Sequence, residues 1–158
     1  MISIEFGSNK YHYRVGGIIR SEDFVLFQQV VGDTLWFIPG GRVEVNETSE
    51  ETICREMEEE FAISILNKQL VWIAETFVKF PERQLHEVAL YYLLEVKKDH
   101  YIFNNKYEFY GEEGSFINKW IHIDELDNYR IVPEFVVPEL RSLDALQGIK
   151  HIVHKSVR

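Results

Sequence analysis

A predicted helix carries three glutamates whose spacing could hold a metal ion: Glu56, Glu59 and Glu60. At i, i+3 and i+4 they lie on one helical face, where like charges repel each other. They also stand in the C-terminal half of the helix, close to the negative end of its dipole. A bound divalent cation would remove this cost, and a set of oxygen ligands favours Mg²⁺ or Mn²⁺. The alternative is a solvated acidic face that holds no metal.

The loop before this helix favours the metal site. Gly40 and Gly41 follow a proline, and adjacent glycines let the backbone approach another group closely. Glu47 comes next, and Arg55 can reach either Glu47 or a glutamate one turn away on its own helix. A glycine turn alone would be a common strand-to-loop connection. The combined spacing of glycines, acids and one arginine is difficult to attribute to chance.

The helix itself is predicted over residues 48–61. Thr48 and Glu51 form a capping box, because each side chain can bond to the backbone N–H of the other residue. Helical winding predicts an apolar stripe that faces a sheet and is made of Ile53, Cys54, Met57 and Phe61. Cys54 is the only cysteine, so no intramolecular disulfide can form, and we expect a small buried hydrophobic residue there.

The segment from Gly41 to Ile63 resembles the Nudix hydrolase box, G-x5-E-x7-R-E-U-x-E-E-x-G-U, where U is a bulky apolar residue. The fixed positions of the box are matched by Gly41, Glu47, Arg55, Glu56, Glu59 and Glu60. Met57 is a looser match, and Ala62 replaces the family glycine. Glycine at a helix exit usually adopts a left-handed conformation, which costs alanine about 1–2 kcal/mol. The aromatic and β-branched neighbours of Ala62 favour a helix that ends here.

The resemblance implies an α/β (α+β) fold, the Nudix-type α/β/α sandwich in which a mixed β-sheet lies between helices. It also implies divalent-metal-dependent hydrolysis of a nucleoside diphosphate linked to another moiety, with Mg²⁺ or Mn²⁺ as cofactor and a small nucleotide as substrate. One alternative is a Nudix-fold nucleotide-binding or sensor module without turnover, and another is a structural protein with an acidic helix. The retained carboxylates argue against a pure binding module, which would not need them.

The same resemblance implies roles for individual residues. The implied metal ligands are Glu56, Glu59 and Glu60. Arg55 would orient them through Glu47, while Gly40 and Gly41 would leave room for the metal and the phosphates. A polyanionic substrate and an acidic protein also require a cation between them. Activation of the attacking water would fall to a carboxylate such as Glu59 or to the metal.

A later loop can also supply the base in some members of the family. Residues 107–117 carry Glu108, Glu112 and Glu113, and we include Glu113 among the candidate catalytic residues. An ordinary polar surface loop is the alternative. Glu87, which begins a strongly apolar strand, is a second candidate, although an acid at this position is more often a surface residue at a strand end.

Strands and two helices must position these residues. Alternating, β-branched and aromatic segments predict strands at 11–20, 24–31, 35–38, 70–80, 85–96 and 118–123. The other segments are predicted as a turn at 39–41, loops at 41–47 and 99–115, a terminal helix at 139–146 and a last strand or basic tail at 151–154. Pro138 suits the first position of the terminal helix. This order predicts a single domain over residues 1–158, with a sheet packed between helices.

Composition limits the classes of partner. The 158 residues include 17 Lys and Arg against 26 Asp and Glu, a formal net charge of −9, which disfavours nucleic-acid binding as the main task. The sequence shows no signal-peptide pattern and no apolar run long enough for a bilayer, so we expect no membrane association and a cytoplasmic location. A homodimer is compatible with the sequence. Residues that could stack on a base, or simply belong to the core, are Trp36, Phe37, Trp72 and Phe77.

Overall fold

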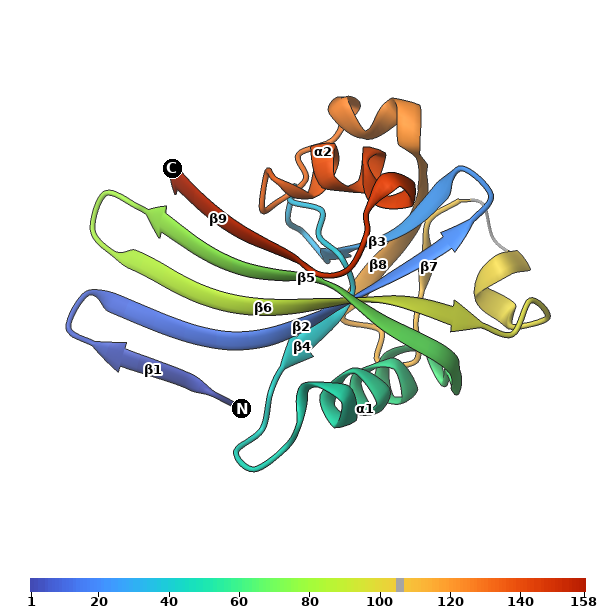
Figure 1. The fold of residues 1–158 in the computed structure, drawn as a ribbon, viewed down its shortest axis with the longest axis horizontal. Helices are drawn as coiled ribbons and strands as arrows, with labels where there is room; N and C mark the ends of the chain where they lie inside the picture. Colours follow the sequence, from blue (N-terminus) through green and yellow to red (C-terminus); the bar gives the residue numbers. More distant parts are fainter. Residues whose placement is uncertain (105–106) are drawn as a thin grey trace.

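A computed structural model describes residues 1–104 and 107–158 of the protein. The chain is built around a mixed β-sheet (Figure 1). Its strands are β1 (Ser3–Phe6), β2 (Asn9–Ser21), β3 (Phe24–Val30), β4 (Gly40–Arg42), β5 (Ile65–Lys79), β6 (Gln84–Val96), β7 (Phe109–Tyr110), β8 (Phe116–His122) and β9 (Lys150–Val157). The order across the sheet is β7-β8-β3-β2-β6-β5-β9, and β1 and β4 both pair with β2. The β2–β6 and β5–β9 pairs are parallel and the others antiparallel.

Helices cover both faces of the sheet. The helical segments are α1 (Ser49–Phe61), α2 (Val136–Arg141) and the 3₁₀ turns η1 (Tyr101–Asn104), η2 (Ile123–Asn128) and η3 (Leu143–Ala145). In Figure 1, α1 lies below the sheet and α2 above it. This arrangement confirms the predicted α+β sandwich with a mixed sheet between helices. Within the described ranges, none of the helices has the length and apolar character needed to cross a membrane.

Each face of the sheet has its own hydrophobic core. The α1 side includes Val15, Ile19, Leu26, Ile53, Met57, Phe61 and Trp120. The α2 side includes Ile18, Trp36, Trp72, Tyr91, Phe135, Val136 and Leu140. Successive residues of a strand point to opposite faces, so neighbours such as Ile18 and Ile19 serve different cores. Trp36 and Trp72 are therefore core residues rather than exposed stacking platforms.

Strand β2 changes partners along its length, and this change positions the site. Its C-terminal end pairs with β3 only through Arg20 and Ser21, whereas residues 14–16 pair with β4. β4 approaches so closely that a Cβ at Gly40 would overlap the carbonyl oxygen of Val15. Glycine is therefore required at this position by backbone packing.

Several predicted elements are confirmed and others are wrong. The helix at 48–61 and the strands beginning near residues 11, 24, 70, 85 and 118 are present, most of them longer than expected. Residues 35–38 do not form a strand, because only isolated bridges connect Trp36 and Phe37 to other segments. Gly40–Arg42, predicted as turn and loop, is the short strand β4 instead. Its two glycines give no strand signal in the sequence, because strand propensity comes from side chains that pack on a sheet.

The C-terminal region also differs from the prediction. α2 covers 136–141 rather than 139–146, and Pro138 occupies its third position rather than its first. Proline is tolerated there because N–H groups of the first turn have no intrahelical partner. Residues 151–154 belong to β9, which extends the sheet beside β5. The short strand β1 was not predicted at all.

The expectation for Cys54 is wrong as well. Its side chain is exposed, whereas Ile53 and Met57 are fully buried on the same helix. The inward face of α1 therefore includes Thr52 and Glu60 in place of Cys54. The predicted loop at 99–115 contains η1 and β7, and its residues 105 and 106 lie outside the described part of the chain.

Candidate active site

Both ends of α1 are fixed by local backbone chemistry. At the N-terminus, the Glu51 N–H donates to Thr48 Oγ1 at 3.1 Å and the Thr48 N–H donates to a Glu51 carboxylate oxygen at 2.8 Å, which is the predicted capping box. At the C-terminus, Ala62 adopts left-handed angles of φ 54° and ψ 35°, and its N–H bonds to the Glu58 carbonyl. The helix ends at Phe61, so the expectation that Ala62 lies at or just past the end is confirmed.

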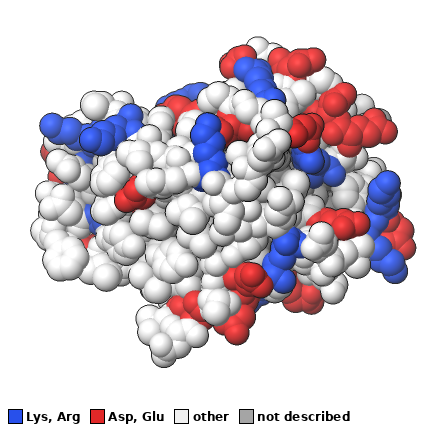
Figure 2. Space-filling model, in the orientation of Figure 1, with Lys and Arg blue, Asp and Glu red and all other residues white. Residues whose placement is uncertain are grey.

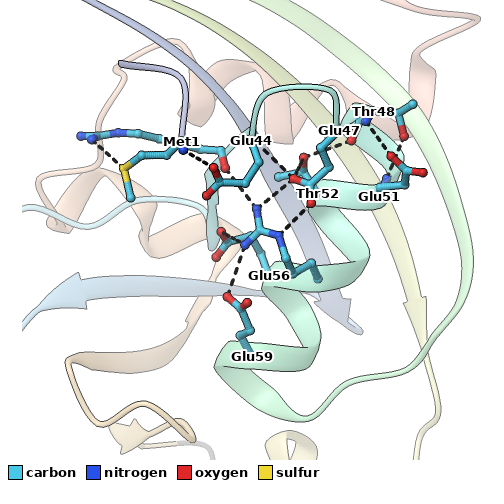
Figure 3. Close-up of polar contacts among 10 residues, drawn as sticks. Met1, Glu44, Glu47, Thr48, Glu51, Thr52, Glu56 and Glu59 are labelled. Atoms are coloured by element: carbon cyan, nitrogen blue, oxygen red, sulfur yellow. Dashed lines mark hydrogen bonds and ion pairs between the residues drawn. The ribbon is translucent and has the colours of Figure 1, made fainter. Parts of the chain in front are cut away.

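Arg55 connects acidic side chains of the helix and its preceding loop, namely Glu47, Glu56 and Glu59, which are labelled in Figure 3. Its Nε and Nη2 donate to the two carboxylate oxygens of Glu47, each at 2.9 Å. Its Nη1 donates to Glu56 at 2.9 Å and to Glu59 at 3.3 Å. Nη2 also donates to the carbonyl oxygen of Arg42 at 3.3 Å, which ties the helix to β4. The planar guanidinium thus holds three carboxylates and one backbone group in a fixed arrangement.

This network determines the charge of Glu47. Hydrogen bonds from Arg55 and then from the Thr52 hydroxyl lower the pKa of Glu47 to about 2. The carboxylate partners in turn raise the pKa of Arg55, so the pair is ionised at any ordinary pH. The sequence left Glu47 and the glutamates one helical turn away, Glu51 and Glu59, open as partners of Arg55. The structure selects Glu47 and Glu59, adds the adjacent Glu56, and uses Glu51 in the helix cap.

Glu60 lies in a different environment at the other end of the helix. Only 4% of the residue is exposed, and its carboxylate accepts a hydrogen bond from Gln28 Nε2 at 3.1 Å. Burial raises the pKa of Glu60 to about 8, and the neighbouring charges of Glu56 and Glu113 act in the same direction. The pKa of Glu56 is also raised, chiefly by desolvation. In the absence of a cation, Glu60 is therefore protonated at neutral pH.

Gln28 is a site residue that the sequence analysis missed. It is 1% exposed, and its Oε1 has no hydrogen-bond partner in the described structure. A signal was available, because a glutamine is unusual in the buried part of an otherwise apolar strand. The pairing of Gln28 with Glu60, however, depends on the fold, since the two are 32 residues apart.

The two glycines have separate structural reasons. Gly40 is required by the backbone of β2, as described above. At Gly41, an added Cβ would overlap the carboxylate of Glu56. The absence of a side chain at Gly41 therefore lets the acidic face of α1 lie directly against β4.

The loop before β8 brings one of the three candidate loop glutamates to the helix. The Glu112 N–H donates to the Glu60 carbonyl oxygen at 2.8 Å, which docks the loop on the end of α1. Glu113 lines a shallow hollow together with Gln28, Glu60 and Gly111. Glu113 is close enough for its charge to raise the pKa of both Glu56 and Glu60. Glu108 is exposed and shows no such link.

Glu87 does not lie at this cluster and is not a surface residue. It is only 8% exposed, within β6, and its ion-pair partner is His12 Nδ1 at 3.7 Å. The sequence-based alternative of an exposed acid at a strand end is therefore wrong. The fold separates Glu87 from the carboxylates of α1.

The donor set of α1 fits a hard divalent cation. Glu56, Glu59 and Glu60 supply oxygen atoms only, which is the ligand chemistry of Mg²⁺ and Mn²⁺. The described residues contain no group of three acidic, His or Cys side chains already gathered as ligands, and Glu56 and Glu59 are hydrogen-bonded to Arg55. Glu60 is buried beside one neutral partner and two acids, and the charge of Arg14 does not offset burial and these acids, so a further positive charge would stabilise the ionised carboxylate.

Charge is unevenly distributed over the surface. Figure 2 shows lysine and arginine side chains gathered at the end of the sheet where β9 and the β5–β6 hairpin lie. A groove of about 510 Å³ at this end is lined by Lys10, Lys79 and Lys155, among others. The acidic chain thus has a basic region that is separate from α1.

Comparison with known proteins agrees with the geometry of the site. The NUDIX domain model matches residues 10–140. The chain is 28% identical over 116 residues to the uncharacterized Nudix hydrolase YvcI of Bacillus subtilis (strain 168), covering 73% of this chain and 69% of that protein. It is 32% identical over 92 residues to the 8-oxo-dGTP diphosphatase of Buchnera aphidicola, covering 58% of this chain and 59% of that protein, which is less than two thirds of its length.

Solved structures show the same fold. The MutT protein from Bacillus halodurans superposes with a TM-score of 0.61 at 19% identity, covering 90% of this chain and 89% of that chain. The family model includes all of α1 and the strands that surround it. Together with the Arg55 network and the acidic face of α1, this match shows that the chain belongs to the Nudix hydrolase family.

Proposed function

We propose that this chain hydrolyses a nucleoside diphosphate linked to another moiety, with Mg²⁺ or Mn²⁺ as the cofactor. The observation that carries the proposal is the arrangement of α1, in which Arg55 orients Glu47, Glu56 and Glu59 while Glu60 is buried beside them. A module that only bound nucleotides would have no need of this set. The relative named as an 8-oxo-dGTP diphosphatase supports a nucleoside phosphate as the substrate class.

In this proposal, the metal ligands are Glu56, Glu59 and Glu60. The metal would neutralise the phosphates and polarise phosphorus. Arg55 keeps the carboxylates in position through its bidentate contact with Glu47. Glu60 would hold the cation as a carboxylate, so its proton would be released on binding, because the positive charge would stabilise the ionised form.

The attacking water needs a base within reach of the phosphates. Glu59 is half exposed and hydrogen-bonded to Arg55, and Glu113 lies on the loop beside Glu60. Either carboxylate could accept a proton from water as its oxygen attacks phosphorus, after which the anhydride bond breaks and the phosphorylated leaving group departs. Gly40 and Gly41 would leave room for the metal and the phosphates, and the lack of a side chain at Gly41 lets β4 lie directly against Glu56.

A hydrolysis screen tests the proposal. Nucleoside triphosphates, nucleotide sugars, ADP-ribose and dinucleoside polyphosphates would be incubated with Mg²⁺ or Mn²⁺, and phosphate-containing products would be identified by chromatography. We expect metal-dependent release from at least one class. Binding without release in every class would favour the sensor module. A cytoplasmic location and a homodimer stay predictions from the sequence alone.

A further inference from the structure

Two buried amides, Gln28 and Asn118, form a cross-strand pair beside Glu60. They lie opposite each other on β3 and β8, and they are exposed by only 1% and 0%. Because side chains alternate between the two faces of a sheet, both point to the same side as the core residues Leu26 and Trp120, which is the side of α1. The shallow hollow at the end of α1 is lined by both amides and by Glu60. Polar side chains of the sheet therefore meet the helix within an otherwise apolar core.

The backbone that carries the Gln28 side chain is held on both sides. The Gln28 N–H donates to the carbonyl oxygen of Phe37 at 2.8 Å, and the Phe37 N–H donates to the carbonyl oxygen of Gln28 at 2.9 Å. Strand β8 lies on the other side of the residue. A side chain on a paired strand is held more precisely than one on a loop. Gln28 therefore reaches Glu60 from a fixed position in the sheet.

The hydrogen bonds of the Gln28 side chain do not offset the cost of its burial. Its Nε2 donates to the Glu60 carboxylate at 3.1 Å, but its Oε1 is buried without a hydrogen-bond partner among the described residues. A buried amide loses its hydrogen bonds to water, and one new bond recovers only part of this loss. A methionine of similar length would lose none. Stability alone therefore gives no reason for a glutamine here, which indicates a role in the site.

Glu60 depends on this amide because Arg55 holds the other carboxylates. Arg55 donates to Glu56 and to Glu59 on the same helix. Within the part of the chain that the structure describes, the hydrogen-bond donor to the Glu60 carboxylate is Gln28. The three carboxylates of the helix face are thus oriented by two separate groups, a guanidinium on the helix and an amide on the sheet.

We propose that Gln28 is a positioning residue for the divalent cation, because its amide holds the Glu60 carboxylate in the orientation in which it would bind the metal. This inference rests on the proposed function and adds a residue that lies outside the segment from Gly41 to Ile63. Groups that hydrogen-bond to metal-ligating side chains fix their orientation, and loss of such a group typically lowers metal affinity by about 10–100-fold. The effect of Gln28 should therefore appear in metal affinity.

Titration with Mn²⁺ alone tests this role without any substrate. EPR spectroscopy measures the free Mn²⁺ ion and so gives the dissociation constant. Gln28→Met keeps the length of the side chain and removes both polar atoms. We expect Mn²⁺ binding to weaken by about tenfold or more, whereas the melting temperature in EDTA should fall by no more than about 4 °C. A purely structural residue would show the reverse, a lower melting temperature with unchanged Mn²⁺ affinity.

A second variant and a matched control accompany this measurement. Gln28→Asn keeps an amide but shortens the side chain by one methylene, so it should also weaken Mn²⁺ binding, and it provides the test if Gln28→Met does not fold. Gln29→Met is the control, because Gln29 is the next residue of β3 and points to the opposite face of the sheet. The control should leave the Mn²⁺ affinity unchanged.

A double-mutant cycle identifies the carboxylate through which Gln28 acts. Glu60→Gln should itself weaken Mn²⁺ binding, since it removes a charged ligand. In the Glu60→Gln background, Gln28→Met should cause little further loss, because the carboxylate that the amide orients is already absent. A loss as large as in the wild-type background would show that Gln28 does not act through Glu60.

The remaining outcomes also decide the assignment. Unchanged Mn²⁺ affinity in folded Gln28→Met or Gln28→Asn would overturn the inference, and so would an equal loss in Gln29→Met. Absence of Mn²⁺ binding by the wild-type chain would overturn it as well. Mn²⁺ binding that depends on Gln28, in a chain that releases no product in the hydrolysis screen, would support the positioning role and contradict only the proposed turnover.

Discussion

Glu60 and Glu87 are two buried glutamates, exposed by only 4% and 8%, yet their surroundings drive their pKa values in opposite directions. Glu60 faces the neutral amide of Gln28 and the negative charges of Glu56 and Glu113, and its pKa rises to about 8. For Glu87, the nearby histidine and two arginines overcome the same desolvation and lower its pKa. Burial therefore does not fix the charge of a carboxylate; the groups around it do.

The comparison separates two kinds of polar site. Glu87 has its positive charges built into the protein, so it can remain ionised and serve as a permanent hydrogen-bond acceptor. For Glu60, desolvation and the charges of Glu56 and Glu113 outweigh the one positive charge that acts on it, that of Arg14, so the pKa is raised and a bound cation could displace the proton. On the α1 side, the positive charge near the buried carboxylate is therefore too small to keep it ionised, whereas on the α2 side the neighbouring charges are sufficient. Variants that exchange or remove these charges test whether the difference is functional.

The largest effect is expected on the α1 side. Glu60→Gln and Glu59→Gln should each reduce metal-dependent turnover by about 100-fold or more, since each removes a strong charge that stabilises the transition state. The fold should survive because the substitution is isosteric and relieves like-charge repulsion. Steady-state rates with Mg²⁺ and Mn²⁺ measure this loss. Glu58→Gln, exposed on the same helix, is the matched control, and near wild-type rates in both Glu59→Gln and Glu60→Gln would exclude the metal assignment.

Arg55→Lys should have the next largest effect, a loss of about tenfold or more in turnover, although the charge is conserved. Lysine cannot make the bidentate contact with Glu47 while also holding Glu56 and Glu59. Kinetics at several metal concentrations would show whether the apparent metal affinity falls together with the rate. Arg83→Lys, on the exposed β5–β6 connection, serves as the control. Full activity and metal affinity in Arg55→Lys would contradict an orienting role for the guanidinium.

The opposed pKa shifts also predict how stability depends on pH without metal. Because the pKa of folded Glu60 is raised from 4.5 to about 8, the folded state retains a proton that the unfolded state has lost between these values. The Glu60 contribution to the free energy of unfolding therefore falls as pH rises through this window, by at most about 1.4 kcal/mol per pH unit. Glu87 and Glu47 have lowered pKa values, so their contributions are present above 4.5 and are lost as pH falls.

Thermal unfolding in EDTA across this pH range measures the effect. Glu60→Gln should flatten the decline between pH 4.5 and about 8, whereas Glu87→Gln should leave the decline in place. Saturating Mg²⁺ should also reduce the decline in the wild-type chain, because the cation takes the place of the proton. An equal slope in wild-type protein and Glu60→Gln would show that the two buried glutamates do not differ in the way described.

The smallest effect concerns the helix end that carries Glu60. Ala62 has a left-handed backbone, so Ala62→Gly should stabilise the protein by about 1 kcal/mol through relief of strain. Turnover should hardly change, since Ala62 follows the carboxylates and its side chain is exposed. Chemical denaturation measures the gain. Ala145→Gly, in a right-handed 3₁₀ turn, should instead destabilise by about 0.5–1 kcal/mol. A destabilised Ala62→Gly would mean that the helix continues through this position.

Local chemistry explains what could be predicted from the sequence. Thr48 and Glu51 specify the helix start within four residues of chain, and the spacing of Glu56, Glu59 and Glu60 identifies the acidic face. The long apolar strands were also recognisable from their side chains. Elements that consist mainly of glycine or that depend on distant partners could not be recognised in this way. For this reason β4 was predicted as turn and loop, and β9 was left as either a strand or a basic tail.

The sequence by itself determined the fold class, the helix that carries the acidic side chains and the family to which the chain belongs, because these depend on the order and spacing of residues close together in the chain. Only the tertiary structure decided that Gln28 meets Glu60, that Glu113 is the loop glutamate beside them, and that Glu87 faces a separate cavity. These contacts join segments far apart in the sequence, and the charge of each buried carboxylate depends on which distant groups the fold places beside it.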